Sequence, residues 1–340
     1  MKAVIMAGGM GTRLRPVTGD KPKPMADLLG RPIMEHIVLH LKDCGFDDIC
    51  AALKYRAGDI MAHFGDGSRF GVRMQYRLEE DALGTAGGVK NCADFYGDED
   101  FLVISGDAAC DFDLLRLMAE HKNKDAAVTI ALHRNPEPLR YGLAVSDGDG
   151  FIRSFIEKPD WSRVVTDCVN TGIYVISPRV MELVPAGRPC DFGKELFPEL
   201  LRRGEKLLGL EMAGYWCDIG TPLSYYRCCA DAIEGKLKLR LPEGMRPEAE
   251  TGAVEKKDSG LSLELPCKNR AELMRVLSAE LMALGADYSD GIILRGRNYE
   301  MHIRPSSALS ALRMAVKSDD AEFAEELLSS AAAAAAALDM

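Results

Sequence analysis

Strand-like apolar runs alternate with helix-like segments as far as about residue 235, and this alternation constrains the fold more than any other feature. The strand-like runs fall at 2–8, 47–55, 71–79, 100–107 and 126–134. Between them, apolar residues recur at helical spacing at 31–46, 57–67, 84–96 and 113–124. Repeated strand–helix units predict an α/β domain with a doubly wound, mostly parallel, Rossmann-like sheet.

The composition and periodicity of the sequence change after Gly235, and we expect residues 1–235 to form the α/β domain. Residues 236–266 are rich in proline, glycine and charge without a helical period, which favours a linker that has room for short strands. Residues 267–340 show a small α+β pattern. It comprises a helix at 269–284, strands at 291–296 and 298–305, and a terminal helix at 318–338 with an alanine run.

The composition limits the classes of partner. The chain has 340 residues, of which 47% are hydrophobic, and its formal net charge is −10. A general nucleic-acid binder is usually basic, so we expect no nucleic-acid partner and only a local anion site. No apolar run approaches the roughly 20 residues of a membrane span, and no signal peptide is evident. The 10 cysteines form no CxxC pair, so we expect reduced thiols and a cytoplasmic protein.

The stretch MAGGMGTRLRPVTGDKPKPM at 6–25 is rich in glycine and positive charge and follows the first strand-like run. It matches neither the GxxxxGK[ST] loop nor the dinucleotide fingerprint, and by itself it is compatible with a tight connection only. Arg13 follows the glycines, so its guanidinium and the backbone amides are suited to one phosphate chain. Lys23 lies between Pro22 and Pro24, which stiffen the backbone that carries it. These features predict a phosphate site.

The same stretch resembles the signature of the sugar-1-phosphate nucleotidyltransferases. Further motifs follow in the order of that family: LGTAGG (83–88), SGD (105–107), YG (141–142), EKP (157–159), NTGIY (170–174) and YWCDIGTP (215–222). The resemblance covers about residues 1–233, and the LGTAG form is similar to that of the mannose-1-phosphate guanylyltransferases. It implies that a sugar-1-phosphate attacks the α-phosphorus of a nucleoside triphosphate and expels pyrophosphate.

The resemblance also implies site residues. Arg13, Lys23 and Asp107 are expected to be catalytic, and Asp107 and Asp218 to hold Mg²⁺. The nucleotide is expected at Ala7, Gly8, Gly9, Gly11, Thr12, Arg13, Glu80, Gly84, Thr85 and Gly87. The sugar phosphate is expected at Gly142, Glu157, Lys158, Asn170 and Gly172. Taken singly, the strand-end aspartates are equally compatible with helix caps, and EKP with a surface turn.

The substrates are less constrained than the chemistry. Glu79 and Glu80 precede the glycine loop at 83–88, and a carboxylate can accept the N1–H and N2–H of guanine. We therefore expect GTP and mannose-1-phosphate, with Glu80 at the base. The alternatives are another base or sugar, such as UDP- or dTDP-glucose or a GDP-heptose, or a non-catalytic protein that binds sugar nucleotides and regulates a partner. The sequence leaves the oligomeric state open, a homo-oligomer included.

Residues 290–328 resemble the last domain of the phosphohexomutases. Arg304, Pro305 and Ser306 match the start of the loop that holds the substrate phosphate in that family, but the next four residues lack its Gly-Thr-Glu-Pro. The sequence also contains no phosphoserine loop and no DxDxD-type metal loop. We therefore expect a degenerate mutase-like tail without mutase activity.

Overall fold

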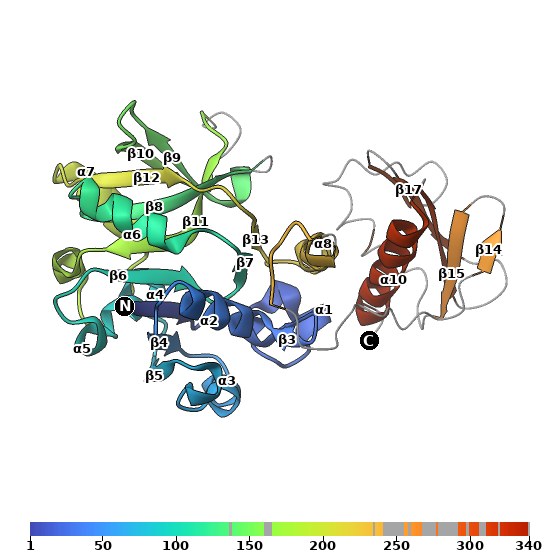
Figure 1. The fold of residues 1–340 in the computed structure, drawn as a ribbon, viewed down its shortest axis with the longest axis horizontal. Coiled ribbons are helices and arrows are strands. Elements are labelled where there is room, and N and C mark those ends of the chain that lie inside the picture. Colours follow the sequence, from blue (N-terminus) through green and yellow to red (C-terminus); the bar gives the residue numbers. More distant parts are fainter. Residues whose placement is uncertain are drawn as a thin grey trace.

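The computed structural model describes residues 1–135, 138–159, 165–233, 235–240, 255–257, 260–266, 277, 292–296, 299–305, 311–318 and 320–338. A nine-stranded sheet forms the centre of the N-terminal part, with the order β10-β9-β11-β6-β1-β4-β5, while β8 pairs with β11 and β12 (Figure 1). Its strands are β1 Lys2–Ala7, β4 Asp48–Leu53, β5 Arg73–Leu78, β6 Phe101–Ser105, β8 Val128–Arg134, β9 Gly142–Ser146, β10 Ile152–Glu157, β11 Cys168–Ile176 and β12 Leu207–Glu211.

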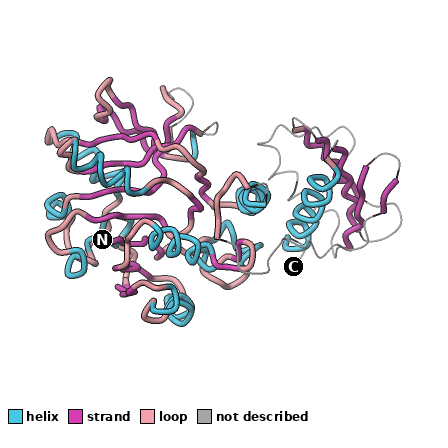
Figure 2. The backbone as a smooth tube through the Cα atoms, viewed as in Figure 1, coloured by secondary structure: helices cyan, strands magenta, loops and turns pink. Residues whose placement is uncertain are grey.

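Helices cover both faces of this sheet, which confirms the predicted α/β class (Figure 2). Along β1, Ile5 belongs to one apolar cluster and its neighbour Val4 to the other, as the twofold period of a strand requires. The first cluster includes side chains of α2 Ile33–Asp43, α3 Ala57–Phe64 and α6 Leu114–Asn123. The second includes side chains of α4 Gly84–Lys90, α5 Ala93–Tyr96 and α7 Phe197–Arg202.

Two predicted helices differ in extent from the observed ones. The segment at 31–46 begins as β3 Arg31–Pro32, which pairs with β2 Asp27–Leu28, so the helix starts only at Ile33. The segment at 84–96 divides into α4 and α5. The division comes where the Cys92 amide bonds to the Val89 carbonyl at 2.9 Å, a tighter turn than that of an α-helix.

One edge of the sheet collects several chain segments. Strands β1 and β6 are parallel with Met6 opposite Ser105, so Gly8 and Asp107 follow neighbouring strand ends, as predicted. The antiparallel strand β11 begins at this same edge, because Ile173 pairs with Ile104. A short ladder, which the sequence did not predict, joins β7 Ala108–Cys110 to β13 Trp216–Asp218. It places Asp218 opposite Ala108, next to Asp107.

A second sheet forms in the C-terminal part, with the order β14-β15-β18-β17-β16. Its strands are β14 Glu255–Lys257, β15 Gly260–Pro266, β16 Ile292–Arg295, β17 Tyr299–Pro305 and β18 Ala311–Ser318. Because β14 and β15 lie within the expected linker 236–266, this sheet begins upstream of the expected boundary at 267. The expected helix at 269–284, apart from Leu277, and residues 306–310 lie outside the described residues.

Helix α10, Ala321–Leu338, packs on this second sheet through a small apolar core. It also contacts α8 Pro222–Ile233 and α1 Arg15–Thr18 of the N-terminal part (Figure 1). None of the helices in the described part of the chain is long and apolar enough to cross a bilayer. The described cysteines are all free thiols, as expected.

Glycines at the start of α4 allow this helix to lie close to residues 188–190. Gly84 has a φ of +72°, and a Cβ at that position would lie 2.6 Å from the Cys190 carbonyl oxygen. A Cβ at Gly87 would lie 2.9 Å from the Arg188 carbonyl oxygen. The amides of Ala86 and Gly87 donate to the same Cys190 carbonyl, at 2.9 and 3.1 Å. The glycines of the LGTAGG motif therefore have a packing role.

We predict that Gly84→Ala lowers the free energy of unfolding by about 1–3 kcal/mol, because the variant combines a strained φ with a backbone collision. Gly58→Ala is the matched control, since Gly58 lies in α3 with open space around its Cβ position. This control should gain roughly 0.5 kcal/mol from the better helix former. Equilibrium unfolding in urea measures both changes. Wild-type stability in Gly84→Ala would contradict the close packing.

Candidate functional site

A cavity of about 260 Å³ opens at the edge where β1 and β6 end. It collects the predicted phosphate loop, Lys23 and Asp107 around one space. Its lining consists of Met6, Ala7, Gly9, Gly11, Thr12, Arg13, Lys23, Pro24, Asp107 and Gly220. Gly11 has a φ of +57°, and a Cβ there would lie 2.6 Å from the Cβ of Lys23. A glycine at this position lets the loop pass directly against the lysine.

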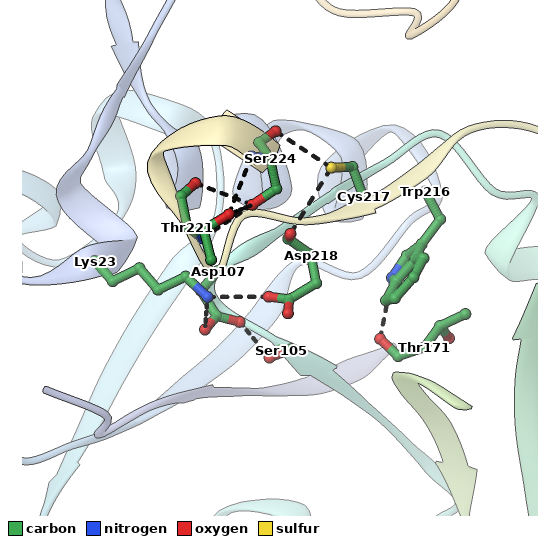
Figure 3. A network of polar contacts seen from close by, with 9 residues as sticks. All are labelled: Lys23, Ser105, Asp107, Thr171, Trp216, Cys217, Asp218, Thr221 and Ser224. Atoms are coloured by element: carbon green, nitrogen blue, oxygen red, sulfur yellow. Dashed lines mark hydrogen bonds and ion pairs between the residues drawn. The ribbon is translucent and has the colours of Figure 1, made fainter. Parts of the chain in front are cut away.

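Lys23 lies between two carboxylates (Figure 3). Its Nζ is 2.7 Å from Asp107 Oδ2 and 3.0 Å from Asp218 Oδ1. The second oxygen of Asp107, Oδ1, accepts a hydrogen bond of 2.6 Å from Ser105 Oγ. The Lys23 side chain is only 9% exposed, whereas the two aspartate side chains are 31% and 32% exposed. The lysine is therefore buried beneath carboxylates that still face solvent.

The charges of this cluster stabilise one another. Burial by itself would lower the pKa of Lys23, but Asp107 and Asp218 outweigh it, and the pKa is raised above its usual value. Burial by itself would raise the pKa of Asp107, but the charge of Lys23 and the hydrogen bonds from Lys23 and Ser105 outweigh it, and the pKa is lowered. Lys23 and Asp107 therefore both carry charge at neutral pH.

Arg13 adds a cation on the open side of the cavity. It lies in the short 3₁₀ turn Thr12–Leu14, and its side chain is exposed. Among the residues that the structure describes, no carboxylate forms an ion pair with it. A Cβ on Gly220 would lie 3.3 Å from Arg13 Nη2 and 3.0 Å from Asp218 Oδ2, so the absence of a side chain at 220 leaves this approach open. The guanidinium is free to bind an anion in the cavity.

The carboxylate pair suits Mg²⁺ when a substrate supplies further oxygens. In the described part of the chain, no three His, Cys, Asp or Glu residues gather as a complete metal site. Mg²⁺ is commonly held by one or two carboxylates together with substrate phosphates and water, so two carboxylates are enough. Asp107 and Asp218 already converge on a positive charge, that of Lys23. Their chemistry and convergence fit the cation expected from the sequence.

The structure separates the two glutamates near the expected base site. The side chain of Glu80 is exposed, and its carbonyl oxygen accepts a hydrogen bond from Lys54 Nζ at 2.7 Å. Glu79 is half-buried, and its Oε2 accepts the Leu83 amide at 3.1 Å. Its Oε1 lies 3.4 Å from a Cβ built on Gly8 and 2.5 Å from one built on Gly88. Glu79 therefore lies between the phosphate loop and the glycine motif.

Burial raises the pKa of Glu79, and the Leu83 amide and Lys54 oppose this shift only in part.

Thr85, another residue expected at the nucleotide, is hydrogen-bonded within the protein. Its hydroxyl donates to Asp191 Oδ2 at 3.0 Å and accepts the Phe192 amide at 2.9 Å. Thr85 therefore links α4 to the segment that follows residue 190.

Glu157, which is expected at the sugar phosphate, lies between two glycines. A Cβ on Gly142 or on Gly193 would be 2.7 Å from Glu157 Oε2. Burial raises the pKa of Glu157, and Asp191 adds to this, while the charges of Lys158 and Lys194 oppose it. Both lysines are exposed, and Lys158 has a positive φ of 42°, which is uncommon for a residue with a side chain.

Two expected sugar-side residues lie on β11. Asn170 donates to the Tyr174 hydroxyl at 3.0 Å and accepts the Gly172 amide at 3.0 Å. Gly172 has a φ of +76°, and a Cβ there would lie 3.2 Å from the Cβ of Ser105. The bend at Gly172 thus places these two residues next to Ser105 and, through it, Asp107.

The sequence does not point to Ser105 or Lys194, and it does not distinguish Glu79 from Glu80. Ser105 belongs to the SGD motif, in which the resemblance implies a role for the aspartate only. Lys194 lies in the single π-helical turn Phe192–Leu196, and no periodic pattern in the sequence predicts this turn. The surroundings of Glu79 and Glu80 differ only in the folded structure.

We predict that ionised Asp107 stabilises the fold above about pH 4, because its pKa is lower in the folded than in the unfolded protein. This contribution is lost as the pH falls through the folded-state pKa. The stability advantage of wild type over Asp107→Asn should therefore be largest near pH 7 and shrink below about pH 4. Urea unfolding from pH 7 to pH 3 measures it, with the exposed Asp20→Asn as the control. An advantage that stays constant with pH would contradict the lowered pKa.

Comparison with known proteins places this geometry in a family. The family model described as nucleotidyl transferase matches residues 2–235. A UTP–glucose-1-phosphate uridylyltransferase of Synechocystis sp. is 37% identical over 267 residues, which are 74% of this chain and 69% of that protein. A mannose-1-phosphate guanylyltransferase of Mycobacterium tuberculosis is 36% identical over 234 residues, which are 68% of this chain and 65% of that protein. The match thus spans about two thirds of each relative.

Among solved structures, a putative glucose-1-phosphate thymidylyltransferase from Bacillus anthracis, in complex with a sucrose, has a TM-score of 0.62 and 32% identity. The match covers 68% of this chain and 95% of that one. The three proteins share a sugar-1-phosphate in their names but differ in the nucleotide. The chain belongs to the nucleotidyl transferase family, and within it to the sugar-1-phosphate nucleotidyltransferases.

Proposed function

We propose that the chain transfers the guanylyl group of GTP to mannose-1-phosphate, giving GDP-mannose and pyrophosphate. The observation that carries the proposal is the cluster of Lys23, Asp107 and Asp218 at a cavity that the glycine-rich loop also lines, together with Arg13, which forms no ion pair with a carboxylate among the described residues. In this reaction a phosphate oxygen of the sugar forms a bond to the α-phosphorus. The bond from that phosphorus to the oxygen that bridges the β-phosphate breaks.

The reaction needs positive charge more than it needs a base. The attacking group is already an ionised phosphate oxygen, so no general base has to remove a proton. The barrier comes from bringing two polyanions together and from the charge on the leaving pyrophosphate. Arg13 and the amides near Gly8, Gly9 and Gly11 would hold the triphosphate. Lys23 would reach the α-phosphate from the floor of the cavity that it lines.

Asp107 and Asp218 would hold Mg²⁺, and Ser105 would orient Asp107 through its hydrogen bond. When bound, the metal ion supplies charge neutralisation and alignment of the phosphate oxygens. The bend at Gly172 lies against Ser105, so the residues proposed to hold the metal ion and those proposed to hold the sugar phosphate are in contact. This contact would position the attacking phosphate close to the metal.

Glu157 would accept hydrogen bonds from the sugar hydroxyls. Gly142 and Gly193 flank its carboxylate, and neither adds a side chain next to it. Lys158 and Lys194 would bind the phosphate of the sugar, since both influence Glu157 electrostatically and are exposed. The amide of Lys194 donates to Asp191 Oδ1 at 3.1 Å, which fixes the backbone that carries this lysine.

For the base, we propose Glu79 in preference to Glu80. Its Oε1 faces Gly8 and Gly88, and it has no hydrogen-bond donor among the described residues. A carboxylate there is suited to the adjacent N1–H and N2–H donors of guanine. Uracil and thymine present one N–H between two carbonyl oxygens and so offer a poorer match. The exposed Glu80 has no comparable position at the loop.

We predict that Lys23→Met lowers kcat by on the order of 10²–10³-fold, because the charge it would supply acts on the transition state. Lys21→Met is the matched control, since Lys21 is an exposed lysine of the same loop, and it should retain wild-type kcat. Pyrophosphate release under saturating substrates measures both, with thermal unfolding as a check of folding. A change confined to KM in Lys23→Met would limit this lysine to substrate binding.

A pyrophosphate-release assay over GTP, UTP, dTTP and ATP, combined with mannose- and glucose-1-phosphate, tests the substrates. GTP with mannose-1-phosphate should give the highest kcat/KM. Glu79→Gln should reduce the preference for GTP over UTP by on the order of 10–100-fold, the value of one or two hydrogen bonds to the base. Glu80→Gln is the control and should leave the preference unchanged. Equal or better turnover of another nucleotide by wild type would refute the choice of guanine.

A further inference from the structure

A positive charge already occupies the point where the two metal-site carboxylates meet. Lys23 Nζ contacts one oxygen of each, Asp107 Oδ2 at 2.7 Å and Asp218 Oδ1 at 3.0 Å (Figure 3). The remaining oxygen of Asp107 is held by Ser105. One oxygen of Asp107 and one oxygen of Asp218 are therefore directed at the ammonium group of Lys23.

We infer that Lys23 and the divalent cation compete for this carboxylate pair, so that the protein without nucleotide holds its metal site closed. The inference rests on the proposed function for the assignment of Asp107 and Asp218 as metal ligands. The site opens when a phosphate group in the cavity becomes the new partner of Lys23. Binding of the nucleotide then increases the affinity for the metal ion, and binding of the metal ion increases the affinity for the nucleotide.

The competition between Lys23 and the divalent cation is electrostatic. Two carboxylates and one ammonium group carry a net charge of −1, so the ammonium group already neutralises part of the negative charge of the carboxylates. A divalent cation placed between the same oxygens would lie beside the ammonium, and two like charges at such a short distance repel because solvent can screen them only in part where the lysine is buried. The Lys23 side chain is 9% exposed, so it cannot turn into bulk solvent without leaving this pocket.

The geometry also provides the alternative position for the ammonium. The backbone of Lys23 is held between Pro22 and Pro24, whereas its four-carbon stem can change rotamer. Lys23 and Gly11 line the same cavity and are in contact, so the phosphate loop lies within reach of the lysine. A triphosphate held by that loop would offer oxygens in exchange for those of Asp107 and Asp218.

Titration of the full chain with Mn²⁺, followed by electron paramagnetic resonance without nucleotide, tests the competition. Lys23→Met should bind Mn²⁺ more tightly than wild type by about tenfold, a coupling of ordinary size between sites. Arg13→Met is the matched control, because it removes a charge from the same cavity without an ion pair to either carboxylate. It should change the affinity by less than about threefold, since an exposed and more distant charge is screened.

A double variant shows whether the gain passes through the carboxylates. Adding Asp218→Asn to Lys23→Met should abolish the tighter binding. Lys23→Gln serves as a second variant should the methionine variant fail to fold, with circular dichroism as the check. Equal Mn²⁺ affinity of wild type and both Lys23 variants would overturn the inference, as would an equal gain in Arg13→Met.

The outcome is independent of turnover. A protein without transferase activity that still shows the tenfold gain would refute the proposed function and leave the competition intact. A protein that synthesises GDP-mannose but shows equal Mn²⁺ affinities would leave the proposed function intact and refute the competition.

Discussion

A buried ammonium group must be compensated by opposite charge, and at Lys23 this requirement joins three distant parts of the chain. Removal of one partner from a buried ion pair costs about 3–5 kcal/mol, because the other charge is left in a medium that solvates it poorly. Asp107 follows β6, and Asp218 ends β13, more than a hundred residues later. The fold has to bring both to the first loop, and the ladder between β7 and β13 does so.

The change of strand direction within the central sheet determines how much of the chain can reach this edge. In the parallel part, β6, β1, β4 and β5 all end there, so their following loops gather on one side. Strand β11 runs in the opposite direction and therefore contributes the residues at its beginning, Asn170 and Gly172. Loops after parallel strands thus face the start of an antiparallel strand. The glycine-rich loop and the segment of Asn170 and Gly172 therefore lie at the same edge of the sheet.

Apolar residues at helical spacing predict α2, α3 and α6. Of the central sheet, the sequence predicts β1, β4, β5, β6 and β8, but not β9, β10, β11 and β12. It does not predict β7 and β13, which are three residues each and owe their existence to pairing across more than a hundred positions. The same holds for β14, which pairs with β15. Strands of three residues carry too few residues for a period, and they are stabilised by the partner strand. Strand β15 is longer and its leucines alternate, but it lies in a segment whose proline, glycine and charge favour a linker.

In the candidate site, too, some residues are revealed by a local pattern and others only by the tertiary structure. Arg13 and Lys23 are recognisable because charged residues next to a glycine-rich strand end are distinctive, whereas Asp107 is expected from the resemblance to the family. The structure places all three around one cavity. The environments of Glu79 and Glu80 depend on how the chain leaves β5, and two adjacent glutamates look equivalent in the sequence. Lys194 depends on a turn that Asp191 caps through its side chain. Contacts of this kind are formed by the tertiary structure and leave no local pattern.

The Thr85 hydroxyl has a consequence beyond its own segment. It donates to Asp191 and accepts the amide of Phe192, while Asp191 in turn holds the amides of Gly193 and Lys194. The glycine motif beside Glu79 and the lysine beside Glu157 are therefore parts of one hydrogen-bonded frame. Under the proposed function, this frame joins the segment at the base to the segment at the sugar phosphate. We therefore expect a substitution that moves one of these segments to alter the selectivity for both substrates.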